Sequence, residues 1–157
     1  MDNKKYYELT EEGRANLEAE RQHLIDVDRP NNIKALQDAR SQGDLSENAD
    51  YDAARDEQSR IEARIAEINE ILKNVKIITK DKSTRVATGK EVTIKFIELD
   101  KTEVYNIVGT IEADPFLHKI SNESPLGKAI IGHDKGAIVT VVTEKGKEFK
   151  VEIIDIK

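Results

Sequence analysis

Two acidic residues, Asp44 and Glu47, stand three positions apart in the segment ARSQGDLSENADYDAARDEQ, residues 39–58. Gly43 precedes them where a helical pattern ends, and glycine suits the left-handed conformation that closes many helices. Ionised carboxylate oxygens are ligands for a hard cation such as Mg²⁺, and the positive end of a helix dipole favours the ionised forms. Two carboxylates fill only part of an octahedral shell, so we expect this pair to share Mg²⁺ with ligands from another molecule.

The same spacing also has a purely structural interpretation. Asp-x-x-Glu resembles a capping box, in which Asp44 accepts a hydrogen bond from the backbone N–H of Glu47 and Glu47 reaches back. Most such pairs only begin helices, so the spacing alone favours the cap over the metal site.

Four neighbouring side chains are candidates for supporting the acidic pair. Asn48 and Tyr51 either shape this segment or contact a partner; the alternative is a first-turn polar residue and a packing ring. Arg40 and Arg55 either meet RNA phosphate and acidic partner groups or are solvated charges paired along their helices.

Two helices are predicted to meet at this segment. Thr10 is a suitable N-cap for the first, which continues to about Gln42 with a bend expected near Pro30. The second has apolar residues at steps of four and three, a heptad seam. Its members are Ile61, Ile65, Ile68, Leu72 and Val75, with Ala54 one heptad earlier. In the first helix Leu17 and Leu24 share a heptad phase, and Ala35 and Ala39 follow. These patterns predict an antiparallel coiled-coil hairpin over residues 1–75, with its tip near residues 43–48.

The second half of the chain, residues 76–157, changes to alternating patterns rich in β-branched residues. Strands are predicted over residues 91–99, 102–111, 137–143 and 147–154, with a turn at Glu144–Gly146. Residues 124–132 predict a short helix with Ser124 as N-cap and Gly132 at its end. The whole chain is therefore an α+β protein: a helical hairpin followed by a small α+β domain.

Composition narrows the classes of function. Charged residues make up 36% of the 157 residues and cysteine is absent, which excludes disulfides and thiolate metal sites. Residues 1–75 hold 11 Lys and Arg against 18 Asp and Glu, a net charge of −7, so general nucleic-acid binding is disfavoured. No apolar run suits a membrane helix or a signal peptide, so we expect a cytoplasmic protein. Because the heptad seam is used within the hairpin, we expect a monomer.

The segment GDLSENADYDAARDEQ resembles the hairpin-tip signature of the bacterial Gre family of transcript cleavage factors, approximately G-D-L-x-E-N-A-E-Y-x-A-A. The chain departs from it at Asp50, where Glu is more usual. The segments LTEEG, Arg29-Pro30 and ISNESPLGKAIIG also resemble the family, in order and over the whole chain. The small number of basic residues near the tip resembles the GreA branch more than the GreB branch.

The resemblance implies that the C-terminal domain is FKBP-like and docks on bacterial RNA polymerase, while the coiled coil enters the polymerase's secondary channel. Asp44 and Glu47 would then be the catalytic pair, helping to bind a second Mg²⁺ shared with the polymerase and activating water. The substrate would be the nascent RNA near its 3′ end in backtracked complexes. Because the active site belongs to the polymerase, the chain would be an accessory factor and not an enzyme.

Three alternatives remain open at this stage. Relatives with altered tips enter the same channel and inhibit without cleavage; Asp44 and Glu47 favour the cleavage factor over such an inhibitor. An FKBP-like fold could be a prolyl isomerase, although the chain has no Trp and only three Phe and four Tyr for an aromatic pocket. The third alternative is a plain coiled-coil interaction module in which Asp44 and Glu47 only cap a helix.

Overall fold

The computed structural model describes residues 4–44, 48–79 and 81–157, so Glu47 lies outside the described residues. The chain divides into two compact units. One holds the helices over Arg14–Asn74, and the other combines Lys5–Gly13 with Val75–Lys157. The predicted division into residues 1–75 and 76–157 did not include this return of the N-terminal segment to the second unit. Within the described ranges, no helix is long and apolar enough to cross a membrane.

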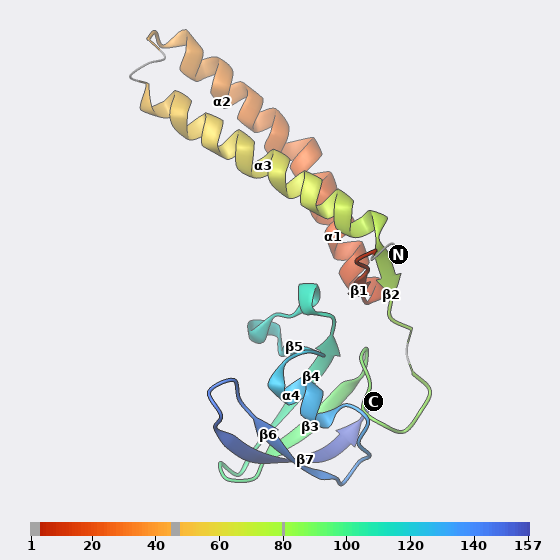
Figure 1. Ribbon diagram of the computed structural model, residues 1–157. Helices are drawn as coiled ribbons and strands as arrows, with labels where there is room; N and C mark the ends of the chain where they lie inside the picture. Colours follow the sequence, from red (N-terminus) through yellow and green to blue (C-terminus); the bar gives the residue numbers. More distant parts are fainter. Residues whose placement is uncertain (1–3, 45–47, 80) are drawn as a thin grey trace. The chain divides into compact units, whose positions relative to one another are not determined.

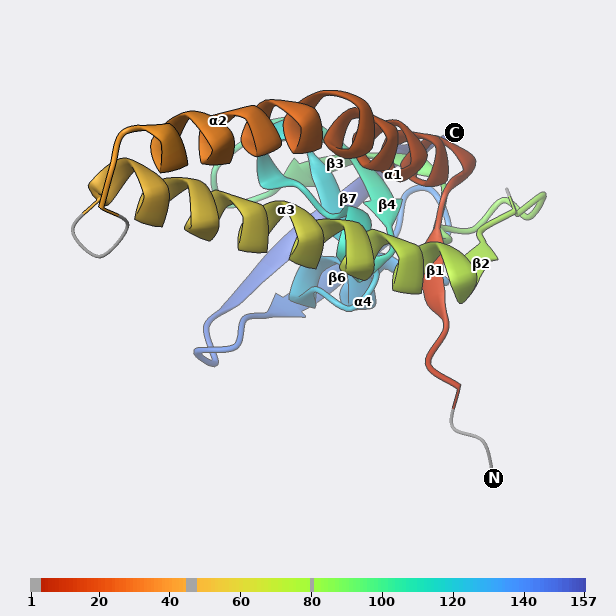
Figure 2. The same cartoon turned by 90° about the horizontal axis from the view of Figure 1, so that it is seen from above.

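The first unit is an antiparallel helical hairpin (Figures 1 and 2). Its first arm is continuous and consists of helix α1 (Glu11–His23), a π-helical segment (Leu24–Asp28) and helix α2 (Arg29–Ser41). Its second arm is one helix, α3 (Ala49–Lys73). Figure 2 shows the two arms side by side, which confirms the predicted hairpin.

The first arm begins as predicted and passes through Pro30 without ending. The hydroxyl oxygen of Thr10 accepts a hydrogen bond from the backbone N–H of Gly13 at 3.1 Å, which makes Thr10 the N-cap of α1. Pro30 has no N–H, and its ring crowds the carbonyl four residues earlier. The wider π-helical turn lies directly before it, and there the N–H of Arg29 donates to the carbonyl of Leu24, five residues back. Where the sequence predicted a bend, the structure has a π-helical widening of the helix just before Pro30.

Large apolar side chains fill the hairpin seam away from the tip, and alanines fill it near the tip. The buried residues of the first arm are Leu17, Leu24, Leu36 and Ala39, with Asn32 among them. Those of α3 are Ala54, Ile61, Ile65, Ile68 and Ile71. Ile71 takes the buried position predicted for Leu72, which is half-buried, and Ala35 is exposed.

The second unit is built on a five-stranded mixed sheet with the order β5-β4-β3-β7-β6. The four predicted strands are confirmed as β3 (Glu91–Phe96), β4 (Lys101–Val108), β6 (Ile138–Val142) and β7 (Glu148–Ile156). Three short strands were not predicted: β5 (Lys119–Ser121), which runs parallel to β4, and the pair β1 (Tyr7–Leu9) and β2 (Val75–Ile77). The predicted α+β class is confirmed.

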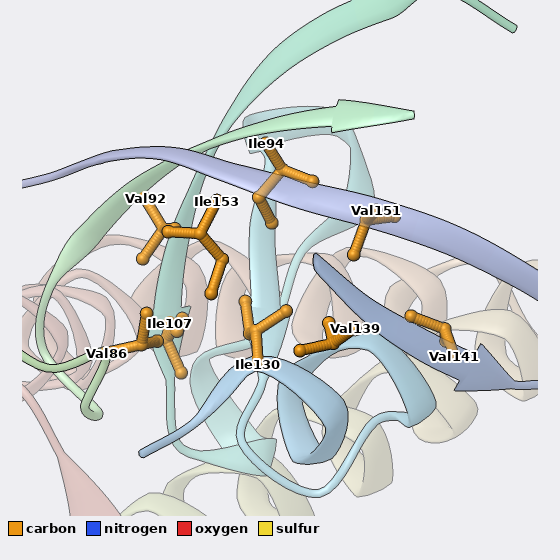
Figure 3. Packing of buried hydrophobic residues seen from close by; sticks show 9 residues of the cluster. All are labelled: Val86, Val92, Ile94, Ile107, Ile130, Val139, Val141, Val151 and Ile153. Carbon is orange, nitrogen blue, oxygen red and sulfur yellow. The ribbon is translucent and has the colours of Figure 1, made fainter. Parts of the chain in front are cut away.

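One face of the sheet carries the core of the second unit. Figure 3 shows Ile130 of helix α4 (Pro125–Ile130) among sheet residues that include Ile107 and Ile153. The helix has the predicted cap, because the Ser124 hydroxyl accepts from the N–H of Gly127 at 3.0 Å. All nine side chains drawn in Figure 3 are buried apolar residues, so burial of apolar surface holds this unit together.

The N-terminal segment joins the second unit through a buried carboxylate as well as through β1. Glu112, in the short 3₁₀ helix Thr110–Glu112, accepts from the backbone N–H of Thr10 at 3.0 Å and from its hydroxyl at 2.5 Å. A Cβ atom at Gly13 would collide with this carboxylate, so a larger residue there would have to displace the Glu112 side chain from Thr10. These contacts explain why residues 5–13 belong with a sheet that lies far along the sequence.

Candidate functional site at the hairpin tip

The tip region, residues 39–51, begins where α2 ends. The N–H of Gln42 donates to the carbonyl of Ala39 at 3.3 Å, and Gly43 has a φ of +116°. An L side chain is strained at that φ, so glycine is needed for the backbone alone. Gly43 therefore closes α2 as predicted and turns the chain into Asp44.

Helix α3 is capped by Asn48. Its side-chain oxygen accepts a hydrogen bond from the N–H of Tyr51 at 3.1 Å, and its backbone is extended, as an N-cap requires. The capping-box interpretation gave this role to Asp44, four residues earlier; the cap of α3 is Asn48 instead. The start of α3 therefore does not account for Asp44, while Glu47 lies outside the described residues.

The amide nitrogen of Asn48 makes a second contact, to the other arm. It donates to the backbone carbonyl of Ala39 at 2.7 Å. That carbonyl also receives the N–H of Gln42, so the end of α2 and the start of α3 meet at one oxygen atom. One short side chain thus caps its own helix and ties it to its neighbour.

The remaining predicted site residues make contacts within the hairpin. The Arg40 guanidinium carbon lies 5.9 Å from the centre of the Tyr51 ring, in a cation–π arrangement that again joins α2 to α3. Arg55 donates to the side-chain oxygen of Gln58 at 3.0 Å, one turn further along α3. Arg40 and Tyr51 therefore belong to the tip region, whereas Arg55 makes its contact within α3.

The tip region carries several acidic side chains. A shallow pocket of about 270 Å³ is lined by Gln42, Asp44, Asn48, Ala49 and Asp50. Asp50 and Asp52 lie in the first turn of α3, where the helix dipole stabilises negative charge. Among residues 4–44, 48–79 and 81–157, no three His, Asp or Glu side chains come together as metal ligands. The carboxylate of Asp44 has the hard oxygens that suit Mg²⁺, but a six-coordinate ion here requires ligands from a partner.

Asn32 was missed from the sequence. It is 6% exposed, and its amide nitrogen donates to the backbone carbonyl of Ala54 at 2.9 Å. The heptad spacing did not predict it, because Leu24 and Asn32 are eight residues apart where a heptad requires seven. The π-helical turn contains the one extra residue and so brings Asn32 to the seam.

The segment SPLGKAIIG of the second unit is largely part of the core. Gly127 and Ile130 are buried, and a Cβ atom at Gly127 would collide with the carbonyl of Ser121. Lys128 is exposed on α4. Gly127 and Ile130 therefore stabilise the fold, and any docking contact made by this segment involves its exposed residues.

The sheet also gathers aromatic side chains that composition suggested were too few for a pocket. The Phe96 ring lies 6.3 Å from that of Tyr105 and 6.0 Å from that of Phe149, and Tyr105 stacks on His118 at 5.3 Å. Burial and a 2.6 Å hydrogen bond to Glu103 raise the pKa of the Tyr105 hydroxyl.

The pocket beside Tyr105 and His118 has a volume of about 400 Å³. Apolar and polar side chains both line it: Ala113, Pro115, Ile120, Glu103, Lys119, Ser121 and Ser124. A pocket with this mixed lining does not test the prolyl-isomerase alternative.

Two family models match the chain. Transcription elongation factor, N-terminal, matches residues 7–77, and Transcription elongation factor, GreA/GreB, C-term, matches residues 80–157. The chain belongs to the GreA/GreB family. Among its relatives, Transcription elongation factor GreA of Acholeplasma laidlawii is 58% identical over 154 residues, covering 98% of each chain.

Further relatives carry the same name. The protein of Mycoplasma pneumoniae is 56% identical over 133 residues, covering 83% of this chain and 82% of its own, and that of Bacillus cereus is 44% identical over 159 residues, covering each chain completely. The predicted family and its GreA branch are therefore confirmed.

Proposed function

We propose that this protein is a transcript cleavage factor that inserts its hairpin tip into the secondary channel of bacterial RNA polymerase. There it stimulates the polymerase to cut backtracked nascent RNA near the 3′ end, which restarts arrested complexes. It is an accessory factor, since the catalytic centre belongs to the polymerase. Family membership supports a role in transcription elongation, and the tip region supports cleavage.

One observation carries the proposal: the N-cap of α3 is Asn48 and not Asp44. Asp44 lies at the far end of a two-helix rod, beside a pocket and near the positive end of the α3 dipole. A carboxylate in this position can be carried into a narrow channel that the second unit could not enter.

The tip carboxylates have two roles in the proposed reaction. Asp44 and Glu47 would hold Mg²⁺ together with oxygen ligands from the polymerase and from an RNA phosphate; the ion, when bound, supplies positive charge for an attacking water. A carboxylate orients this water and accepts its proton as the new oxygen–phosphorus bond forms. The 3′ oxygen of the upstream nucleotide leaves, takes up a proton, and becomes the new 3′ end.

A stalled-complex assay tests the proposal. Purified bacterial RNA polymerase is halted in a backtracked state, and the release of short 3′ RNA fragments is followed with Mg²⁺ present. Wild type should accelerate release, and the double variant Asp44→Asn/Glu47→Gln should lose most of that effect, about 10²-fold or more, while still binding polymerase.

Asp38→Asn/Asp56→Asn is the matched control, since it removes the same charge from exposed positions on both arms. It should cleave like wild type. If both double variants cleave like wild type, Asp44 and Glu47 have no catalytic role. If wild type binds and slows elongation without cleavage, the protein is instead an inhibitor of the same channel.

A further inference from the structure

The oxygen and the NH₂ group of the Asn48 amide bind different helices. Its oxygen accepts from the N–H of Tyr51 in its own helix, and its NH₂ group donates to the carbonyl of Ala39 in the other arm. An amide is suited to this because it carries an acceptor and a donor on one short side chain. Serine or aspartate can keep the cap but cannot make the same bridge.

The bridge matters because apolar packing near the tip is thin. Among residues 4–44 and 48–79, Ala39 and Ala54 are the buried apolar residues nearest the tip, whereas Leu36 is the last large buried side chain of α2. Alanines provide little contact area and no preferred direction, so they leave the position of the arm ends loosely defined. A hydrogen bond has a fixed length and direction, and so it can define what alanine packing cannot.

A second contact, between Arg40 and Tyr51, also joins the two arms. Arg40 follows Ala39, and its guanidinium lies over the ring of Tyr51, three residues after Asn48. The end of α2 and the start of α3 are thus joined twice, by a hydrogen bond and by a cation–π contact. Asp44 lies three residues after Ser41, the last residue of α2, so holding the end of α2 also restricts the position of Asp44.

We infer that Asn48 is a positioning residue for cleavage. Its NH₂ group ties the start of α3 to the end of α2 and so holds Asp44 where the reaction needs it, without contacting RNA or polymerase itself. The inference rests on the proposed function for its effect on cleavage, but its effect on the loop can be measured in the free protein. It predicts that loss of the hydrogen bond to Ala39 affects cleavage even when the hydrogen bond to Tyr51 is kept.

Two substitutions separate the cap from the bridge. Asn48→Ser and Asn48→Asp each retain an oxygen that can cap α3, and each lacks the NH₂ group that donates to Ala39. Both variants should fold, and both should lower the maximal cleavage rate by about tenfold, because displaced catalytic groups lose rate steeply. The concentration for half-maximal effect should stay within about twofold, because the polymerase-binding surfaces are unchanged.

The control variant is Asn31→Ser, the same substitution at an exposed position of the same hairpin, and it should cleave like wild type. Amide hydrogen exchange gives the independent readout. In both Asn48 variants the N–H of Tyr51 should remain protected while the amides of Gln42, Gly43 and Asp44 exchange faster.

Four results would overturn the inference. The first is unchanged exchange at residues 42–44 in both Asn48 variants. The second is wild-type cleavage by both, and the third is a loss confined to the half-maximal concentration, which would make Asn48 a binding residue. A much larger loss for aspartate than for serine would indicate contact with RNA phosphate and would likewise overturn it. Failure of the proposed function is distinguishable, because Asp44→Asn would then cleave like wild type while the exchange effect persisted.

Discussion

Different interactions join the two arms of the hairpin at its base and at its tip. At the base, defined here by Leu17, Leu24, Ile61, Ile65 and Ile68, large aliphatic side chains are almost completely buried. Among the described residues of the tip region, the buried apolar side chain is Ala39. Hydrogen bonds from the Asn32 amide in the middle of the hairpin and from the Asn48 amide at the tip join the arms. Apolar burial supplies free energy without direction, whereas these hydrogen bonds supply direction with little free energy.

Paired charges follow the same division. Arg64 forms a two-pronged ion pair with Glu20, at 2.6 and 2.9 Å, and Arg29 forms another with Glu62, at 2.8 and 2.9 Å. Both pairs cross between the arms away from the tip. The comparison indicates that stability is concentrated at the base, which leaves the tip slender enough to enter a channel and dependent on a few bonds for its geometry.

The largest expected effect is on stability at the base. Ile68 is fully buried, so Ile68→Ala should lower the free energy of unfolding by about 2–5 kcal/mol, measured by urea denaturation. Ile33→Ala, at a side chain that is 45% exposed, is the matched control and should cost well under half as much. Equal losses of unfolding free energy for the two variants would contradict the comparison, because burial at the base would then not contribute more than an exposed position.

The next effect belongs to the tip. Gly43→Ala places a side chain at a φ of +116°, which costs about 1–3 kcal/mol of local strain. The last turn of α2 can relax this strain by fraying, so we expect a several-fold loss of cleavage with a small change in melting temperature. Gly146→Ala, at a φ of +78° in the β6–β7 turn, imposes similar strain elsewhere and should leave cleavage unchanged. Equal cleavage by both variants would show that Gly43 does not set the tip geometry.

A smaller effect on stability is expected at Asn32, which, like Asn48, donates a hydrogen bond to the other arm. Asn32→Val replaces a buried amide in the seam with an apolar side chain, and the Ala54 carbonyl still lies within α3. We expect the free energy of unfolding to rise by about 0.5–1 kcal/mol, with cleavage retained. Asn31→Val is the exposed control and should change neither quantity. A loss of stability in Asn32→Val would mean that hydrogen bonding, and not apolar burial, holds the middle of the hairpin.

The smallest effect is a pH dependence. The hydrogen bond from Arg64 holds the pKa of Glu20 below its ordinary value of 4.5. The folded state therefore binds this proton less readily than the unfolded state, so the stabilisation is present above about pH 4.5 and is lost as the pH falls through the lower folded pKa. Because both side chains are partly solvated, the contribution is small. Melting temperatures of wild type and Glu20→Gln between pH 7 and pH 3 should converge at low pH; parallel curves would contradict the assignment.

Local patterns were sufficient to predict most elements and the acidic tip. Thr10 and Ser124 cap the helices that they were predicted to cap, and Gly43 ends α2, because each acts on backbone groups within three residues. The isoleucine spacing of α3 predicted its buried face, because a helix repeats its faces every seven residues. The capping-box spacing predicted Asp44 as the cap of the second helix, and the structure places Asn48 there instead.

Only the tertiary structure decided the contacts that join distant segments. β1 and β2 are three residues each, too short for a periodic signal, and they pair across the whole length of the hairpin sequence. Asn32 enters the seam because Pro30 is accommodated by a π-helical turn, which shifts the heptad by one residue. Asn48 reaches Ala39 because two separately predicted helices lie close enough for one amide to span them. A sequence determines local backbone preferences directly, but which donor meets which acceptor across two arms depends on how closely their side chains allow the helices to pack.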